Sequence, residues 1–310
     1  MVAILDTGVD SSHPFLKGKV VSEACFSQNY AAEQATSLCK RTKPEVIGKA
    51  AGLPCPSSVQ DCEHGTHVAG IVAGKNAKFS GVAPGAKLIA IQVYSLISDP
   101  AYCQGSATCV AAYESDIISA LEHVGSLAST YSIAAANLSL GGSTYPGNDC
   151  DASGPEIKAA IDGLRAKGIA TVIASGNEYQ RGAVDFPGCI SSAITVAATT
   201  DYGKERITDF SNMSPAVDLL APGDLIQSSV PGNKFASFMG TSIATPHVAG
   251  AWAVLKSANP AFTVDSIEQA LESTGKGMRR SGQTRSRIDI AKALASLKPA
   301  AKGKKAAPGS

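Results

Sequence analysis

The chain is poor in charge, in aromatic side chains and in long hydrophobic runs. Only 17% of its 310 residues are charged and 5% are aromatic, whereas 44% are hydrophobic. A disordered chain needs the opposite balance, so the sequence predicts a folded protein with a sizeable core. The formal net charge of +1 offers no broad field for nucleic acid or an anionic membrane. No stretch supplies the roughly 18 apolar residues of a membrane-spanning helix, so we expect neither nucleic acid nor a membrane as partner.

The start of the chain also lacks the features of an export signal. It reads MVAILDTGVD, without the charged, apolar and cleavage regions of a signal peptide. The eight cysteines nevertheless form an even set, which indicates disulfides and an oxidising compartment. We therefore expect a secreted or extracellular protein whose signal peptide is not present in this chain. Short spacing favours the pair Cys103–Cys109, and the other pairings stay open.

Short apolar runs alternate with amphipathic helical patterns along the chain. The runs predict strands buried on both faces, at residues 2–5, 87–94, 134–140, 170–175 and 193–198. Ile157, Ile161 and Leu164 recur at helical spacing within 154–168, and residues 114–125 repeat the pattern. This alternation predicts an α/β fold with three layers (αβα) around a mainly parallel, doubly wound sheet. We place one domain at residues 1–298 and a flexible basic tail at residues 299–310.

Polar side chains stand where such sheets bind ligands, at the carboxyl ends of strands. Asp6 follows the first predicted strand, His64 opens a glycine-rich helix, and Ser242 begins the helix in GTSIATPHVAG. A serine hydroxyl needs a base to take its proton, and the base needs an acid to fix its tautomer. The sequence therefore predicts a catalytic triad of Asp6, His64 and Ser242. Asn177, after the strand at 170–175, is predicted to stabilise an oxyanion.

Each of these residues taken alone has a simpler structural interpretation. Ser242 suits a helix N-terminus, and Asp6 and Asn177 suit turns. Four residues could in principle bind zinc, namely Cys55, Cys62, His64 and His67. A zinc site is disfavoured, because their spacing is not that of a zinc finger. We expect structural or core roles for His13, His123, His247 and Trp252.

The chain resembles the subtilisin-like serine peptidases (subtilases, peptidase family S8) in five blocks. In the family's own order they are ILDTGVD, HGTHVAG, NLSLGG, ASGNE and GTSIATPHVAG. The resemblance covers nearly all of residues 2–297 and implies the subtilisin-like fold and a serine endopeptidase with an acyl-enzyme intermediate. It implies that Asp6 orients the His64 ring, that His64 is the general base and that Ser242 is the nucleophile. Asn177 and the Ser242 amide would form the oxyanion hole. The chemistry requires no cofactor, the substrates are extended protein or peptide segments, and we expect a monomer.

The resemblance also implies where substrate binds. Ser139, Leu140, Gly141 and Gly142 would form an edge segment that pairs with extended substrate. We expect Ala174, Ser175 and Gly176 to line the site as well. Asp185, in RGAVDFPGC, aligns with the base of the S1 pocket, where relatives often have a small residue. A buried carboxylate there would favour Lys or Arg at P1, whereas the simpler alternative is a surface aspartate.

Several features depart from the family pattern. Relatives usually carry an N-terminal segment and a removed propeptide that this sequence does not contain. Phe15 stands where many relatives have an acidic calcium ligand, and the loop at 73–85 is short, so we expect that calcium site to be missing. Structural calcium elsewhere is left open, since no oxygen ligands have a convincing spacing, and we predict no metal ligand. The basic stretch 277–287 is predicted as a solvated loop, with self-cleavage as the alternative if Asp185 selects basic residues.

Two other functions are weighed against an active endopeptidase. A catalytically impaired relative would keep the peptide groove without turnover. An α/β-hydrolase esterase is disfavoured, because Ser242 lies in G-T-S-x-A-x-P and not in G-x-S-x-G after a strand.

Overall fold

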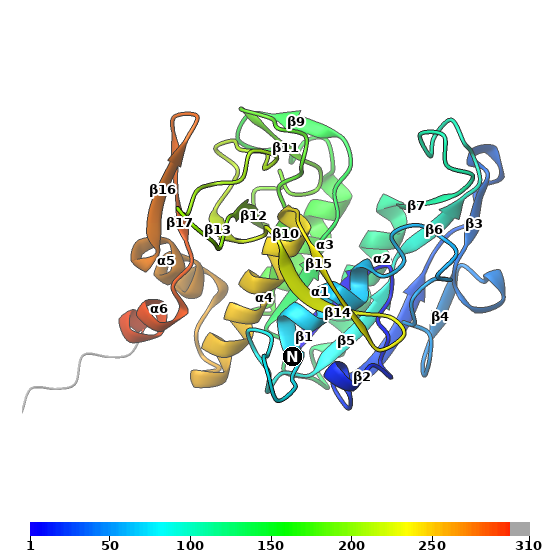
Figure 1. The fold of residues 1–310 in the computed structure, drawn as a ribbon, viewed down its shortest axis with the longest axis horizontal. Coiled ribbons are helices and arrows are strands. Elements are labelled where there is room, and N and C mark those ends of the chain that lie inside the picture. Colours follow the sequence, from blue (N-terminus) through cyan, green and yellow to red (C-terminus); the bar gives the residue numbers. More distant parts are fainter. Residues whose placement is uncertain (298–310) are drawn as a thin grey trace, which may run out of the picture.

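The computed structural model describes residues 1–297, which form a ten-stranded sheet between two layers of helices (Figure 1). In spatial order the strands are β16 (Lys276–Arg280), β17 (Gln283–Arg287), β13 (Leu219–Pro222), β12 (Ile194–Thr199), β10 (Ala170–Ala174), β8 (Ala135–Leu138), β1 (Val2–Asp6), β5 (Leu88–Gln92), β2 (Val20–Phe26) and β4 (Glu45–Ile47). The strands from β17 to β2 pair in parallel, and only the edge strands β16 and β4 pair antiparallel. The predicted three-layer α/β fold with a mainly parallel sheet is confirmed.

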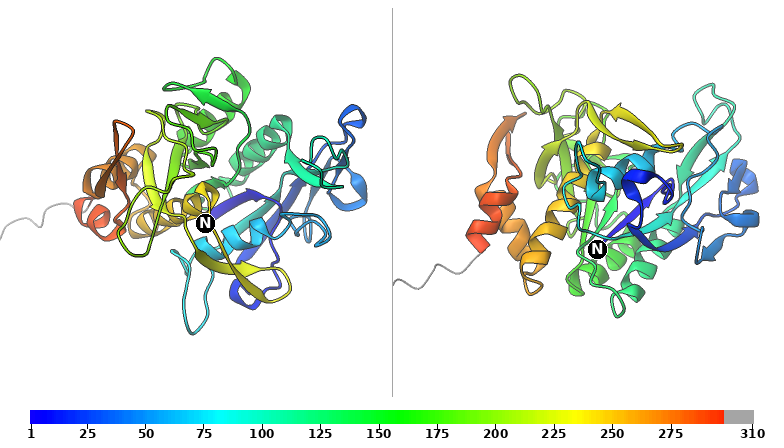
Figure 2. Two further views of the ribbon diagram at one scale, coloured as in Figure 1. Left: turned by 45° about the horizontal axis from the view of Figure 1, so that its top comes forward. Right: turned by 60° about the horizontal axis from the view of Figure 1, so that its bottom comes forward.

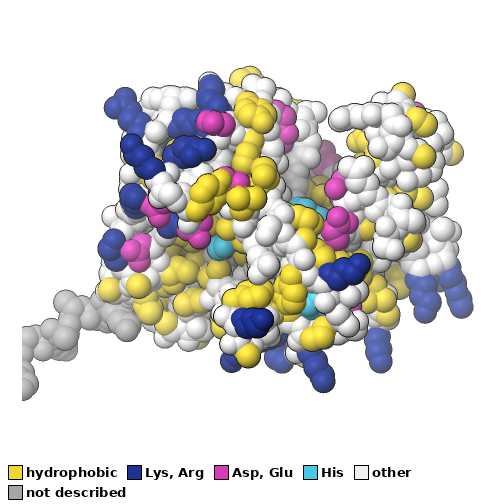
Figure 3. Space-filling model, viewed as in Figure 1, with side chains coloured by type: hydrophobic (Ala, Val, Ile, Leu, Met, Phe, Trp, Pro, Cys, Tyr) yellow, Lys and Arg dark blue, Asp and Glu magenta, His cyan; other side chains and the backbone are white. Residues whose placement is uncertain are grey.

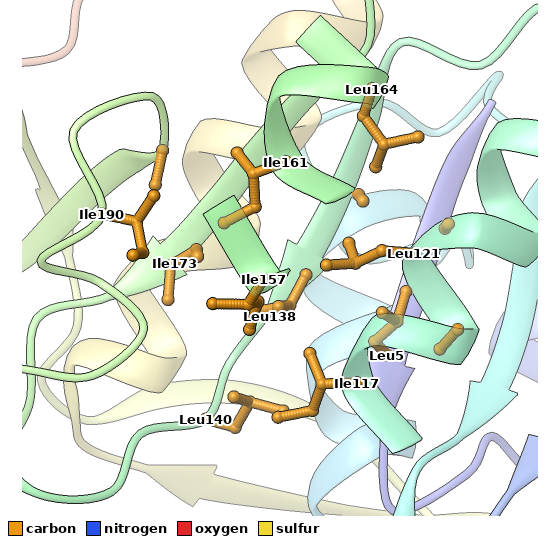
Figure 4. Close-up of a cluster of buried hydrophobic side chains, with 14 of the residues drawn as sticks. Leu5, Ile117, Leu121, Leu138, Leu140, Ile157, Ile161, Leu164, Ile173 and Ile190 are labelled. Atoms are coloured by element: carbon orange, nitrogen blue, oxygen red, sulfur yellow. The ribbon is translucent and has the colours of Figure 1, made fainter. Parts of the chain in front are cut away.

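Helices cover both faces of this sheet, as the views in Figure 2 show. On one face lie α2 (Glu114–Leu127) and α3 (Pro155–Ala166); on the other lie α1 (His64–Ala73), α4 (Thr241–Ala258), α5 (Val264–Thr274) and α6 (Ile290–Leu297). Successive residues of a strand point to opposite faces. Leu5 of β1 therefore packs in the cluster with Ile117 and Ile157 (Figure 4), whereas Ile4 packs in the cluster with Trp252 of α4.

The core residues expected from helical spacing are buried. Ile157, Ile161 and Leu164 all point from α3 into the cluster drawn in Figure 4, and Trp252 is fully buried. The predicted strand at 87–94 is instead divided between two sheets. Gln92 uses its side-chain amide to bond both the N–H and the C=O of Tyr94, so the chain leaves the large sheet at this point.

The basic stretch 277–287 is not the solvated loop that we predicted. It forms the hairpin of β16 and β17, and its turn residues Ser281 and Gly282 have φ of 51° and 80°. Two positive φ values are typical of a two-residue type I′ turn. The hairpin is held because β17 pairs with β13 and because Met278 packs into the cluster that contains Ile207. The predicted tail at 299–310 lies outside the described residues.

Three small sheets and four disulfides complete the fold. The small sheets are β3 (Ala35–Ser37) with β6 (Tyr94–Ile97) and β7 (Cys109–Ala112), β9 (Thr144–Pro146) with β11 (Ala183–Asp185), and β14 (Ile226–Val230) with β15 (Lys234–Phe238). The disulfides are Cys25–Cys39, Cys55–Cys62, Cys103–Cys109 and Cys150–Cys189, which confirms the one predicted pair. No helix within residues 1–297 combines the length and the apolar character needed to cross a bilayer.

Phe15 belongs to a cluster of aromatic rings that joins the short loop at 73–85 to the β14–β15 hairpin. Its ring centroid lies 4.8 Å from that of Phe79 and 5.4 Å from that of Phe235. Gly74 faces the same ring, and a Cβ atom there would lie 1.9 Å from it. At 3% exposure, Phe15 fills this corner with apolar packing.

We expect Phe15→Ala to lower the free energy of unfolding by about 3–5 kcal/mol, because it removes a buried ring and leaves a cavity. Denaturant unfolding of the two proteins measures the difference. Tyr102→Ala is the matched control, since that ring is 61% exposed and its loss should change stability by about 0.5 kcal/mol or less. A change in Phe15→Ala no larger than in the control would show that the cluster does not stabilise this corner.

Candidate active site

Asp6 and His64 meet at the carboxyl end of β1. Asp6 is the last residue of β1 and is fully buried, while His64 is the first residue of α1. The Nδ1 atom of His64 lies 2.8 Å and 3.1 Å from the two carboxylate oxygens of Asp6. An ionised carboxylate only accepts hydrogen bonds, so Nδ1 carries the proton and donates it to Asp6. The Nε2 atom is then left as a proton acceptor.

A glycine allows α1 to approach β1 this closely. A Cβ atom on Gly65 would lie 2.4 Å from the carbonyl oxygen of Gly8 and 3.0 Å from Asp6 Oδ1. The Gly65 N–H donates to the Thr7 hydroxyl at 3.0 Å, which fixes the start of the helix. Burial favours the neutral imidazole, but the charge and the hydrogen bond of Asp6 outweigh it and raise the pKa of His64 above its ordinary value.

Ser242 lies in the first turn of α4, directly after a glycine in an unusual conformation. Gly240 has φ of 147°, a conformation that favours glycine, and it turns the chain sharply into the helix. The Ser139 hydroxyl, at the end of β8, donates to the Ser242 carbonyl at 2.6 Å and itself accepts from Asn137 at 2.9 Å. Helix α1 packs against α4. Within residues 1–297, no hydrogen bond joins the Ser242 hydroxyl to His64.

Asn177 is tied to the same turn of α4. Its Oδ1 accepts hydrogen bonds from the Thr241 N–H at 2.9 Å and the Thr241 hydroxyl at 3.1 Å. Because Oδ1 must be the acceptor, the Nδ2 group is free to donate elsewhere. A Cβ atom on Gly240 would lie 3.0 Å from Ser242 Oγ and 3.7 Å from Asn177 Oδ1, so both side chains flank one point. In the described part of the chain, neither Asn177 Nδ2 nor the Ser242 N–H has a protein acceptor.

Asp185 is not the surface aspartate of the simpler interpretation, because it is only 4% exposed. Its carboxylate lies between the two segments that the sequence predicts to line the substrate site. A Cβ atom would lie 2.9 Å from Asp185 Oδ2 if placed on Gly141, and 2.5 Å from it if placed on Gly176. The absence of side chains at these two glycines leaves the carboxylate in contact with both segments.

Two residues beside Asp185 were missed by sequence reasoning. Asn212 donates through Nδ2 to Asp185 at 3.0 Å and to Glu178 at 2.6 Å. Burial, followed by the charge and the hydrogen bond of Glu178, raises the pKa of Asp185 well above its ordinary value, while Asn212 opposes the shift. Glu178 could have been found from the sequence, because it directly follows Asn177. Asn212 lies in an irregular loop, and no sequence pattern pointed to it.

The other predicted substrate residues divide into exposed and buried ones. Gly141 and Gly142 are exposed, and the Gly142 N–H donates to the Phe186 carbonyl at 2.9 Å, which joins this segment to the one after Asp185. The other five are buried; these are Ser139, Leu140, Ala174, Ser175 and Gly176.

Possible metal ligands lie away from this site. Cys55 and Cys62 form a disulfide, which removes two of the four atoms of the disfavoured zinc arrangement. Within residues 1–297, one acidic group has oxygens within 4.8 Å of one another, namely Asp218, Glu268 and Glu272. Glu268 is paired with Arg165 at 2.7 Å, so a side chain of the protein already balances part of this charge.

Comparison with known proteins agrees with this architecture. The chain is 34% identical over 280 residues to an intracellular serine protease of Paenibacillus polymyxa, which covers 87% of the chain and 71% of that protein. It is 32% identical over 278 residues to subtilisin NAT of Bacillus subtilis subsp. natto, which covers 88% of the chain but only 59% of that relative's length. The solved structure of a protease from Pseudoalteromonas arctica has a TM-score of 0.72 at 26% identity, covering 96% of this chain and 89% of that one.

The sequence pattern of the Subtilase family matches residues 1–289, nearly the whole described chain. With the three-layer fold and relatives above 30% identity, this match shows that the chain belongs to the subtilase family, peptidase family S8.

Proposed function

We propose that the protein is a serine endopeptidase in which Asp6, His64 and Ser242 form the catalytic triad. The observation that carries the proposal is the buried Asp6 carboxylate hydrogen-bonded to His64 Nδ1. It fixes the tautomer in which Nε2 can accept a proton. Membership of the family and the position of Ser242 at the start of α4 support the same assignment.

The residues would act in two half-reactions. His64 Nε2 takes the hydroxyl proton of Ser242 as Oγ attacks the peptide carbonyl carbon, and the resulting imidazolium is stabilised by Asp6. The oxyanion accepts hydrogen bonds from Asn177 Nδ2 and the Ser242 N–H. His64 then gives the proton to the leaving amine, and the acyl-enzyme is hydrolysed by a water molecule that His64 activates. No cofactor takes part in these steps.

The substrate would be an extended segment of a protein or peptide, with Lys or Arg at P1. The N–H of exposed Gly141 and the C=O groups of Gly141 and Gly142 would be available for strand addition, since only the Gly142 N–H is already bonded, to Phe186. Asp185 and Glu178 would receive the P1 cation, because Asn212 bonds to both side chains and a guanidinium or ammonium group beside them would favour their charged forms. We also propose an oxidising, extracellular location, since all eight cysteines are paired.

Replacing Ser242 by Ala should abolish peptide cleavage, with kcat falling by about 10⁶, because no other group can form the acyl-enzyme. The measurement is turnover of fluorogenic peptides by the two proteins, purified identically and compared by circular dichroism. Ser257→Ala is the matched control, because it makes the same change on an exposed residue of the same helix. A folded wild type that binds peptides without cleaving them would instead favour a catalytically impaired relative.

The pH dependence should follow the state of His64, which must be neutral to act as the base. We expect kcat/KM to fall as the pH drops through the pKa of His64, a value held above its ordinary position by Asp6. Asp6→Asn removes that charge, so the acid limb should move to lower pH while kcat falls by about 10⁴. Initial rates across a pH series measure both effects. An acid limb that stays in place in Asp6→Asn would contradict the assignment of Asp6.

Asp185→Asn should lower kcat/KM for substrates with Arg or Lys at P1 by about ten- to a hundredfold. The reason is that it removes the charge-assisted hydrogen bond that we propose between Asp185 and the P1 side chain. Cleavage after Leu should change little. A P1-varied peptide panel measures the ratio, and Asp149→Asn, the same change on an exposed loop, serves as control. The P1 assignment is wrong if wild type cuts after Phe or Leu faster than after Arg.

A further inference from the structure

A basic groove runs beside the outermost strand of the large sheet. It has a volume of about 800 Å³ and is lined by all five residues of β16 and by the loop at 203–207. No residue of β17 lines it, although β17 is the partner strand of β16. Figure 3 shows dark-blue Lys and Arg side chains gathered at this end of the molecule. We call this space the β16 groove.

The charge of the β16 groove is only partly balanced by the protein. Its lining includes five cations and one acid; these are Lys204, Arg206, Lys276, Arg279, Arg280 and Glu205. Lys276 pairs with Glu205 at 2.5 Å, and Arg280 pairs with Asp209 at 3.1 Å. The other three cations have no ion pair with any residue in 1–297.

The remaining positive charge is crowded. Burial, together with the charges of Arg181 and Arg206, lowers the pKa of Arg280 below its usual value. Arg181 and Arg280 both donate to the carbonyl oxygen of Asp209, at 2.9 Å and 3.0 Å. A chain whose net charge is only +1 therefore concentrates unpaired positive charge at one end of its sheet.

The main chain of β16 also offers hydrogen-bonding groups on its open side. β16 pairs only with β17, so it is an edge strand. In a two-residue hairpin the residues next to the turn exchange both hydrogen bonds, and alternate residues then point their groups outward. Arg280 and Gln283 flank the turn here, so Gly277 and Arg279 direct their N–H and C=O groups away from β17. Both of these residues line the groove.

We propose that the β16 groove is a binding site for an acidic, extended peptide segment, which adds to the sheet as a strand beside β16. The edge supplies main-chain hydrogen bonds, and Lys204, Arg206 and Arg279 supply the charge that selects acidic side chains. A polypeptide fits both features, because a sulfated glycan would use the cations but has no main-chain N–H and C=O groups at strand spacing to pair with Gly277 and Arg279. This binding step does not depend on the proposed peptidase activity.

The test uses the full chain carrying Ser242→Ala, and a short fluorescent peptide in which Glu alternates with Thr and which has no Lys or Arg. Fluorescence anisotropy at physiological ionic strength gives the affinity. A peptide with Gln in place of Glu, and a sulfated oligosaccharide as competitor, separate charge from strand pairing. We expect the Glu peptide to bind at least about tenfold more tightly than the Gln peptide.

Two variants divide the contributions of charge and backbone. Arg206→Glu with Arg279→Glu reverses two unpaired charges, and we expect about tenfold weaker binding. Gly277→Pro leaves every charge in place and removes one outward N–H; a Cβ atom there meets nothing closer than 3.8 Å, and proline is tolerated at such an edge. We expect it to weaken binding by about tenfold. Lys40→Glu with Lys49→Glu, on exposed residues near β4, is the matched charge control.

The outcomes separate this proposal from its competitors. Weaker binding in both groove variants, but not in the Lys40 and Lys49 control, supports it. Binding lost on charge reversal but unchanged in Gly277→Pro overturns strand addition, as does a glycan that binds while the Glu peptide does not. Absence of peptide binding would mean that the cations only protect the sheet edge from association. Peptide cleavage is measured separately, in protein that keeps Ser242. There, short peptides with Arg at P1 should be cleaved equally fast with and without Arg206→Glu and Arg279→Glu. A failure of the groove proposal is thereby distinguishable from a failure of the active-site proposal.

Discussion

The first turn of α4 is held by hydrogen bonds from the ends of two neighbouring parallel strands. Ser139, after β8, donates to the Ser242 carbonyl, and Asn177, after β10, accepts from Thr241. Parallel strands end at a common edge, so both anchors are fixed to one rigid sheet. The proposed nucleophile, Ser242, would need little reorganisation before it reacts, and its position depends on the integrity of the sheet. The same edge carries Asp6 at the end of β1 and, through it, His64.

The two buried acids of the candidate site, Asp6 and Asp185, have different surroundings. Asp6 accepts hydrogen bonds from the His64 ring and from the Thr7 N–H. Asp185 instead lies against a second acid, Glu178, with Asn212 as the shared donor, and its charged form is disfavoured until a cation arrives. These surroundings agree with the two roles that we propose, Asp6 as the acid that orients the base and Asp185 as the acid that binds substrate.

The core strands of this fold could be predicted from local patterns in the sequence. Continuous apolar runs predicted β1, β8, β10 and β12 because these strands are buried on both faces, and polar residues at their ends predicted the site. The β16–β17 hairpin was missed because KGMRR and QTRSR lack apolar alternation. Contacts with residues distant in sequence stabilise this hairpin, namely the packing of Met278 and the pairing of β17 with β13. Asn212 was missed because its partners Asp185 and Glu178 are distant in sequence. The other three disulfides had been left open, because eight cysteines allow many pairings.

The near-neutral net charge hides a separation of charge that bears on specificity. If both proposed sites bind polypeptide, Asp185 and Glu178 would disfavour an acidic segment, whereas the β16 groove would disfavour a basic one. The loop from Ile207 to Met213 connects them, since Arg280 bonds to Thr208 at one end of it and Asn212 bonds to Asp185 near the other. A polypeptide with an acidic stretch at one place and a basic residue at another would therefore be oriented by two sites of opposite sign. A polypeptide with a single kind of charge would engage only one of them, so the pair of proposed sites would discriminate by charge pattern and not by net charge.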